Sequence, residues 1–157
     1  MIQTQTLLTL LPAERVRVGL PAASKRELLE TMSALAAHGT AADASVILDA
    51  VLQREALMST GVGQGLALPH ARTQSVDDTT AALAILESAV DYDSLDGSPV
   101  RIVLLLAGPE RERSVHLRLL SRISRVMADA GTRQRLLDAE SVRDVHRALA
   151  DAEAALG

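Results

Sequence analysis

The sequence predicts an α/β fold: a single three-layer domain over residues 1–157, in which a mixed, mostly parallel β-sheet is flanked by helices. Two apolar runs of strand length, at 79–86 and 100–107, provide the first observation. Segments with helical periodicity before and after them provide the second. A turn-rich stretch between the two runs is the third, because a short connection favours an antiparallel pair within an otherwise parallel sheet.

The first elements follow from local signals. Alternation of apolar side chains over Glu14–Leu20 predicts a strand with Val16, Val18 and Leu20 on one face. Ser24 has the spacing of a capping box and begins a helix that Gly39 ends. Asp43 caps a second helix, whose last turn contains Arg54, where a cation suits the negative end of the helix dipole.

The second half of the chain continues this alternation. Thr79–Leu86 and Val100–Ala107 are predicted as internal strands, with turns over Asp91–Gly97 between them. Apolar residues at helical spacing from about Ser114 predict a third helix that ends at Gly131.

Two helices are predicted after that point. Arg133–Leu137 is a short helix, and Ser141 has the spacing of a second capping box before a last helix. The alanine-rich end over 148–157 is expected to fray.

Composition limits the possible functions. Apolar residues make up 48% of the chain and aromatic residues 1%, so the core must consist of Leu, Val, Ile and Ala. The absence of cysteine excludes disulfides, thiolate catalysis and cysteine zinc sites. A net charge of −4, with no basic block, argues against a nucleic-acid partner.

Membrane insertion is not expected either. No apolar run approaches the ~20 residues that cross a bilayer. The first residues lack the basic region of a secretory signal, and we therefore expect a cytoplasmic protein.

The segment Ser59-Thr60-Gly61-Val62-Gly63-Gln64-Gly65-Leu66-Ala67-Leu68-Pro69-His70 is the part of the chain most suited to chemistry. Its glycines allow the loop to curl and to point successive N–H groups at one anion. Pro69 restricts its own φ and favours an extended Leu68, so His70 leaves a stiff backbone. An imidazole beside such a nest of amides is a plausible phosphate acceptor.

Other motifs, and a purely structural role, are alternatives for this segment. No Gly-Lys-Ser/Thr ending follows, as a Walker-type loop would require, and the glycine spacing lacks the dinucleotide fingerprint. A hydrolase triad of Ser59, His70 and Asp77 has no nucleophile elbow to support it. A tight loop that joins a helix to a strand, with an exposed histidine, remains the structural alternative.

The other histidines differ in their settings. His38 precedes a glycine at a helix end, where capping is the expected role, and His146 lies between arginines and is expected at the surface. His116 is near the start of a predicted helix, where free N–H groups attract anions. The histidines are scattered without a His-x-x-x-His pair, so no metal site is predicted.

These residues resemble a known family. The run Arg54-Glu55 followed by Ser59 to His70 is similar to the active-site signature of the enzyme IIA domains of the phosphoenolpyruvate-dependent phosphotransferase system (PTS), in the fructose, mannitol and nitrogen-regulatory class. The resemblance extends through 91–100, the strand that ends at Gly108-Pro109, and His116-Leu117.

The resemblance implies a phosphohistidine carrier. His70 would accept a phosphoryl group from phospho-HPr or an HPr-like carrier, flanked by Arg54 and His116. Further hydrogen bonds would come from a phosphate-binding loop formed by Ser59, Thr60, Gly61, Gly63 and Gly65. No metal, nucleotide or other cofactor is required.

Two functions remain open within this resemblance. In the sugar branch the group would pass to a cysteine of an enzyme IIB partner, whereas in the nitrogen-regulatory branch it would switch the binding of target proteins. The alternative is a non-catalytic interaction module that keeps the fold and binds partners without phosphoryl transfer.

Overall fold

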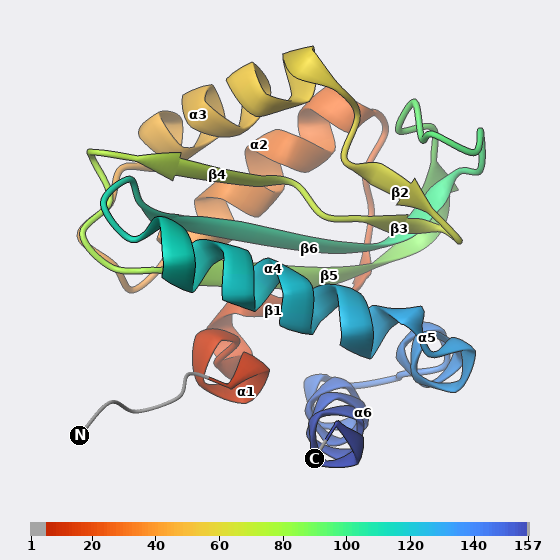
Figure 1. The fold of residues 1–157 in the computed structure, drawn as a ribbon. Helices are drawn as coiled ribbons and strands as arrows, with labels where there is room; N and C mark the ends of the chain where they lie inside the picture. Colours follow the sequence, from red (N-terminus) through yellow and green to blue (C-terminus); the bar gives the residue numbers. More distant parts are fainter. Residues whose placement is uncertain (1–5, 157) are drawn as a thin grey trace.

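A computed structural model describes residues 6–156 and contains a six-stranded sheet between two helical layers (Figure 1). The strand order is β1-β5-β6-β3-β2, and β4 also pairs with β6. Pairs β1–β5, β3–β6 and β4–β6 are parallel, while β5–β6 and β2–β3 are antiparallel. This confirms the predicted mixed, mostly parallel sheet. The strands are β1 Val16–Leu20, β2 Gly61–Gly63, β3 Leu66–Ala67, β4 His70–Thr73, β5 Thr80–Val90 and β6 Val100–Pro109.

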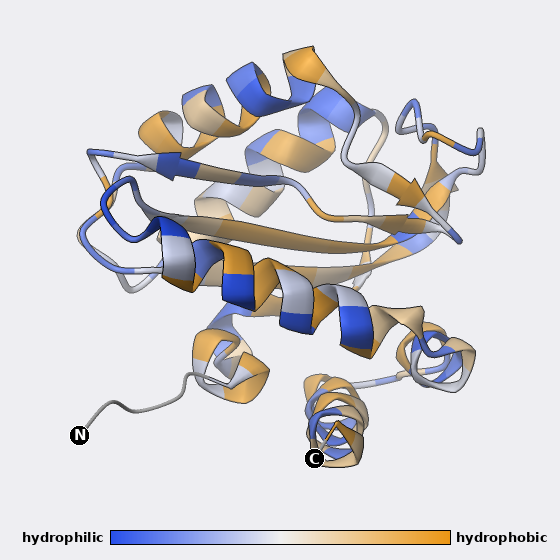
Figure 2. Ribbon diagram, in the orientation of Figure 1, coloured by the Kyte–Doolittle hydropathy of each residue, from blue (hydrophilic) through white to orange (hydrophobic). Residues whose placement is uncertain are grey.

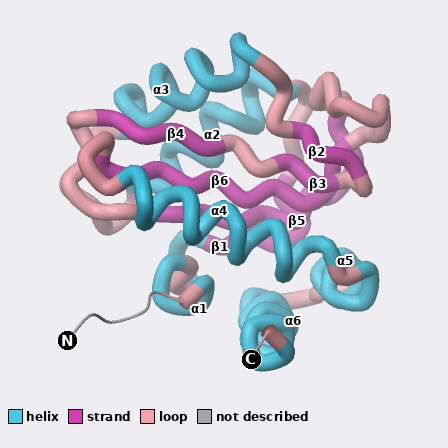
Figure 3. Tube along the Cα trace, in the orientation of Figure 1, coloured by secondary structure: helices cyan, strands magenta, loops and turns pink. Residues whose placement is uncertain are grey.

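The helices divide between the two faces of the sheet (Figure 3). Helices α2 and α3 cover one face, and α1, α4, α5 and α6 cover the other. They are α1 Leu7–Leu10, α2 Lys25–Ala37, α3 Ala44–Leu57, α4 Arg113–Ala128, α5 Ala130–Leu137 and α6 Val142–Ala155, with a 3-10 turn at Ala13–Arg15. None of the helices within 6–156 has the length and hydropathy to cross a membrane.

Two aliphatic cores result from the alternation of side chains along β5. Leu83 and Ile85 pack toward α4 and α6, whereas Ala84 and Leu86 pack toward α2 and α3. Figure 2 shows the corresponding hydrophobic sheet between amphipathic helices. Both long strands are internal, as their continuous apolar runs predict. An internal strand that is covered on both faces needs apolar side chains on both.

The strand β1 departs from the predicted alternation. Val16 and Val18 contact the α4–α6 layer, but Leu20 contacts the α2–α3 layer. The pairing with β5 shifts register between Val18 and Leu20, where Gly19 has a φ of +74°. This irregularity turns the last residue of the strand to the other face.

The predicted helix starts are confirmed by their caps. Ser24, Asp43 and Ser141 accept hydrogen bonds from backbone N–H groups in the first turns of α2, α3 and α6. The predicted end of the third helix at Gly131 is wrong. Asp129 accepts the N–H of Thr132 at 2.8 Å and begins α5, so Gly131 lies within that helix.

The C-terminal segment is helical and makes long-range contacts. Helix α6 extends to Ala155, and its Glu153 carboxylate accepts the backbone N–H of Leu7 at 3.0 Å and the Arg122 Nε at 2.6 Å. The surface assignment of His146 is also wrong, because this half-buried ring contacts the Leu11 carbonyl oxygen through Nε2 at 2.7 Å. The last helix therefore holds the N-terminal segment, a long-range contact that the local sequence cannot reveal.

Candidate functional site

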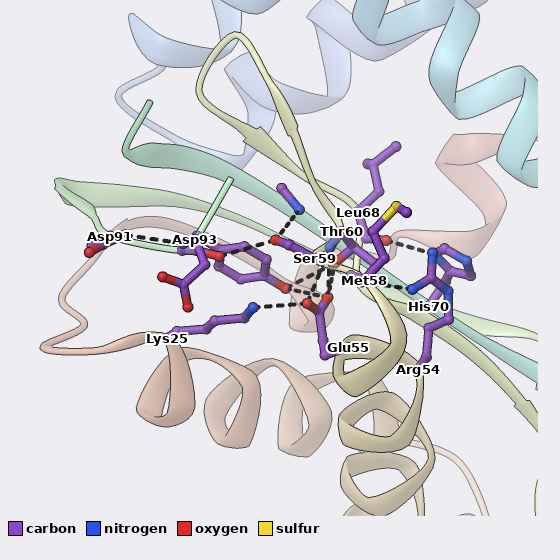
Figure 4. Close-up of polar contacts among 12 residues, drawn as sticks. Lys25, Arg54, Glu55, Met58, Ser59, Thr60, Leu68, His70, Asp91 and Asp93 are labelled. Atoms are coloured by element: carbon purple, nitrogen blue, oxygen red, sulfur yellow. Dashed lines mark hydrogen bonds and ion pairs between the residues drawn. The ribbon is translucent and has the colours of Figure 1, made fainter. Parts of the chain in front are cut away.

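His70 begins β4 immediately after a break in the sheet. Strands β3 and β4 pair with successive parts of the same edge of β6 and are separated by Leu68 and Pro69. The half-buried His70 ring places Nδ1 2.8 Å from the Leu68 carbonyl oxygen (Figure 4). A carbonyl oxygen can only accept, so Nδ1 carries the proton and the neutral ring keeps its lone pair on Nε2.

His116 lies beside this ring. The two ring centroids are 5.7 Å apart and the planes are tilted by 50°. His116 is 5% exposed and belongs to the first turn of α4. Its Nδ1 is buried near Gly108 and has no hydrogen-bond partner among residues 6–156. Because no acceptor meets Nδ1, the neutral ring is expected to carry its proton on Nε2.

Arg54 approaches from the helical layer on the other face. It lies in the last turn of α3, and its Nη1 donates to the Met58 carbonyl oxygen at 2.8 Å, which closes the helix end (Figure 4). This contact uses one of the five N–H donors of the guanidinium and leaves the others available.

The three residues line one pocket of about 410 Å³ between α3, β4 and α4. Arg72 and Arg113 add two basic residues to Arg54, whereas Glu110 is the one acidic residue among the described residues of the lining. The remaining lining residues are Ala50, Gln53, Leu57, Ala71, Leu117 and Leu120. The pocket is therefore suited to an anion.

The site keeps both imidazoles neutral. Burial is the main cause that lowers the pKa of His70, with the nearby Arg54 charge acting in the same direction, while the Leu68 carbonyl opposes it. Burial, followed by the charges of His70 and Arg72, lowers the pKa of His116 to about 4. At neutral pH both rings are therefore uncharged.

The glycine segment does not line this pocket. Gly61 and Gly63 form β2, Thr60 and Ser59 precede it, and Gly65 belongs to the turn before β3. Several amides are already bound within the protein: the Thr60 N–H donates to Glu55 and the Gly61 N–H to the Ser59 Oγ at 3.1 Å. The structure thus brings Arg54, His70 and His116 together, with these five loop residues behind them.

Sequence reasoning missed several members of the site. Arg72 and Arg113 line the pocket, and the buried Glu55 is bound by Lys25 and Tyr92 behind it. Arg72 shares a face of β4 with His70, because residues two apart on a strand do so, but a strand of four residues is too short to be recognised from its sequence. Within residues 6–156, no three His, Asp or Glu side chains gather closely enough to hold a metal ion.

Comparisons with known proteins agree with this geometry. The model of the family described as "Phosphoenolpyruvate-dependent sugar phosphotransferase system, EIIA 2" matches residues 9–152. The fructose-specific EIIA component of Haloferax volcanii is 35% identical over 144 residues, which are 91% of this chain and 94% of that protein. A nitrogen regulatory protein of Pseudomonas aeruginosa is 34% identical over 154 residues, with 98% of each chain covered.

Solved structures show the same fold. The nitrogen regulatory protein IIA-Ntr from Neisseria meningitidis superimposes with a TM-score of 0.85 at 29% identity, over 90% of this chain and 97% of that one. IIA mannitol from Escherichia coli has a TM-score of 0.76 at 23% identity, over 88% and 97% of the two chains. The chain therefore belongs to the EIIA type 2 family of the phosphoenolpyruvate-dependent sugar phosphotransferase system.

Proposed function

We propose that this protein is a phosphohistidine carrier in which His70 accepts a phosphoryl group from phospho-HPr or an HPr-like carrier. The observation that carries the proposal is the hydrogen bond of 2.8 Å between His70 Nδ1 and the Leu68 carbonyl oxygen. It leaves Nε2 as the nucleophile in a pocket lined by Arg54, Arg72 and Arg113.

Only one bond is exchanged in the transfer. The P–N bond of the donor phosphohistidine breaks and its electron pair returns to the donor nitrogen, while the lone pair of His70 Nε2 forms the new N–P bond. The proton stays on Nδ1, where the Leu68 carbonyl stabilises the positive charge that the ring gains. The step needs no metal, redox partner or added nucleophile.

Arg54 and His116 would stabilise the group in transit. Phosphoryl transfer passes through a loose transition state with charge on the equatorial oxygens, so catalysis depends on alignment and on donors already in place. The free N–H groups of Arg54 and the expected Nε2–H of His116 can serve as such donors. Ser59, Thr60, Gly61, Gly63 and Gly65 would support the site from behind.

From His70 the phosphoryl group would either pass to an enzyme IIB cysteine or stay on the ring and switch the binding of a regulatory target. Relatives named for the sugar role and for the regulatory role both match most of the chain. One is named a fructose-specific EIIA component and another a nitrogen regulatory protein. A solved complex of enzyme IIA mannitol with phosphorylated enzyme IIB mannitol from Escherichia coli contains a IIA chain with this fold, with a TM-score of 0.76 at 24% identity.

A reconstituted relay tests the proposal. The chain is incubated with phosphoenolpyruvate, enzyme I and HPr, and His70 is examined for an acid-labile, alkali-stable phosphoryl group by mass spectrometry. We expect stoichiometric labelling of the wild type and none of His70→Gln, because the amide lacks a nucleophilic nitrogen.

Two outcomes decide among the alternatives. An unlabelled wild type, in a mixture that labels a known IIA protein, would contradict the proposal and favour the interaction module. If labelling occurs, addition of candidate IIB proteins shows whether the group leaves His70 for a cysteine, as in sugar uptake, or stays as a regulatory signal.

A further inference from the structure

Glu55 is a buried carboxylate that the transfer does not use directly. Its side chain is 5% exposed and does not line the pocket. Donors from three parts of the chain converge on it: Lys25 Nζ at 3.0 Å, the Tyr92 hydroxyl at 3.0 Å, and the N–H of Thr60 at 3.1 and 3.2 Å from its two oxygens (Figure 4). The Thr60 hydroxyl also donates to Glu55.

These contacts account for the burial of a charge. Each partner offers a proton, so the carboxylate acts only as an acceptor, the arrangement that an ionised group requires away from water. Lys25 is further held by the ring of Tyr92, whose centroid is 4.5 Å from Nζ. The result is a rigid anchor between α2, α3 and the segment after β5.

The anchor continues to His70 through the backbone. Glu55 binds Thr60, and the Thr60 carbonyl oxygen accepts the N–H of Leu68 at 2.9 Å. The Leu68 carbonyl oxygen then meets His70 Nδ1 at 2.8 Å (Figure 4). Thr60 is therefore fixed by Glu55 on one side and fixes Leu68 on the other.

We propose that Glu55 is a positioning residue that sets the tautomer of His70 through Thr60 and Leu68. By holding the Leu68 carbonyl in line with Nδ1, it keeps the proton there and leaves Nε2 free to attack. Its relevance to transfer rests on the proposed role of His70 as the acceptor, but the tautomer itself is a property of the unphosphorylated chain and needs no carrier protein.

NMR of the unphosphorylated chain tests the proposal directly. Two-bond 1H–15N correlations of histidine-labelled protein at pH 8 report which nitrogen of the neutral His70 ring carries the proton. In the wild type we expect protonated Nδ1. In Glu55→Ala the Leu68 carbonyl loses its support, and we expect a mixture of the two tautomers with fast exchange between them.

A matched control separates position from stability. Asp43→Ala removes another carboxylate from the same helix, the cap that accepts the Ser45 N–H at 2.9 Å, without touching the path to His70. This variant is expected to lose stability and to keep the wild-type tautomer. If Glu55→Ala does not fold, Glu55→Gln can replace it, because glutamine keeps the size and one acceptor oxygen. We expect Glu55→Gln to shift the tautomer of His70 in the same direction by a smaller amount.

Single-turnover transfer from phospho-HPr gives the functional measure. Loss of the fixed tautomer should lower the rate of Glu55→Ala about fivefold to tenfold, while Asp43→Ala stays near the wild-type rate. A wild-type tautomer in the folded Glu55 variants would overturn the inference even if His70 is phosphorylated. If the wild type is not phosphorylated but the Glu55 variants show the expected change of tautomer, the transfer function is refuted and the positioning role of Glu55 stands.

Discussion

Arg72 lies two residues after His70 on β4, so both side chains leave the strand on the same face. Its Nη1 donates to the Glu110 carbonyl oxygen at 2.7 Å, which ties the strand to the segment after β6 and holds the guanidinium at the pocket. Arg72 and Arg54 place positive charge beside the half-buried, uncharged ring of the proposed acceptor. This charge would attract the phosphoryl group, which the neutral ring alone would not do.

We predict that Arg72→Gln lowers the single-turnover rate of His70 phosphorylation about tenfold to a hundredfold, because one cationic donor to the phosphoryl oxygens is lost. Arg72→Lys should recover part of the rate, since it restores the charge without the planar fork. Arg17→Gln is the control, because Arg17 donates to the carbonyl oxygens of Glu14 and Val16 and lies outside the pocket. Equal rates for Arg72→Gln and the control would remove Arg72 from the mechanism.

At the scale of residues, the sequence predicts the participants that have unusual local settings. These participants are a histidine after proline, an arginine at a helix end and a histidine at a helix start, and the fold brings all three to one pocket. Glu55 follows Arg54 in the sequence, but its importance comes from Lys25 and Tyr92, which contact it only after folding. No local pattern marks such a residue.

At the scale of elements, the segment 59–70 differs most from expectation. Its glycines predict positive φ angles, and Gly63 and Gly65 have φ values of +99° and +74°. Composition does not say where the amides point, however, and here they support a hairpin of β2 and β3 rather than facing the pocket. Strands of two to four residues are too short for a period to be read, which explains why β2, β3 and β4 were not predicted.

Gly61→Ala should destabilise this hairpin strongly. A Cβ at this position would lie 2.9 Å from the Cα of Ser94, so backbone must move, and we expect a loss of about 1–3 kcal/mol in the free energy of unfolding. Gly97→Ala is a useful comparison, because nothing lies within 4 Å of its Cβ and only the strain of a φ of +76° remains. Urea denaturation of both variants measures the difference, and equal losses would contradict the packing argument.

At the scale of the whole molecule, the layer architecture can be predicted because each of the two long internal strands contains a long apolar run and the helices have one apolar face. Strand order is not readable. The two pieces β3 and β4 share one edge of β6 around Leu68 and Pro69, an arrangement set by pairing between residues more than 30 positions apart. That break places His70 at the pocket, so the least predictable part of the sheet creates the proposed site.

Burial of the two imidazoles makes the stability of the whole molecule depend on pH. In the folded protein the pKa of His116 is about 4, and that of His70 is also lowered, whereas both are near 6.5 when unfolded. The unfolded chain therefore binds more protons below pH 6.5, and stability falls as the pH drops toward the folded pKa. The titration of His116 alone should lower the free energy of unfolding by about 2 kcal/mol between pH 7 and pH 5.

The variant His116→Gln removes this titration, so its free energy of unfolding should change less than that of the wild type between pH 7 and pH 5. The pKa values of Asp43, Asp96 and Asp129 are also lowered, from about 3.8. These carboxylates therefore change the free energy of unfolding mainly below about pH 3.8, outside the range from pH 7 to pH 5. Urea denaturation across the range gives the slopes, with the exposed His38→Gln as control. Parallel slopes for His116→Gln and the wild type would show that burial does not lower the pKa of His116, and would contradict the predicted pH dependence.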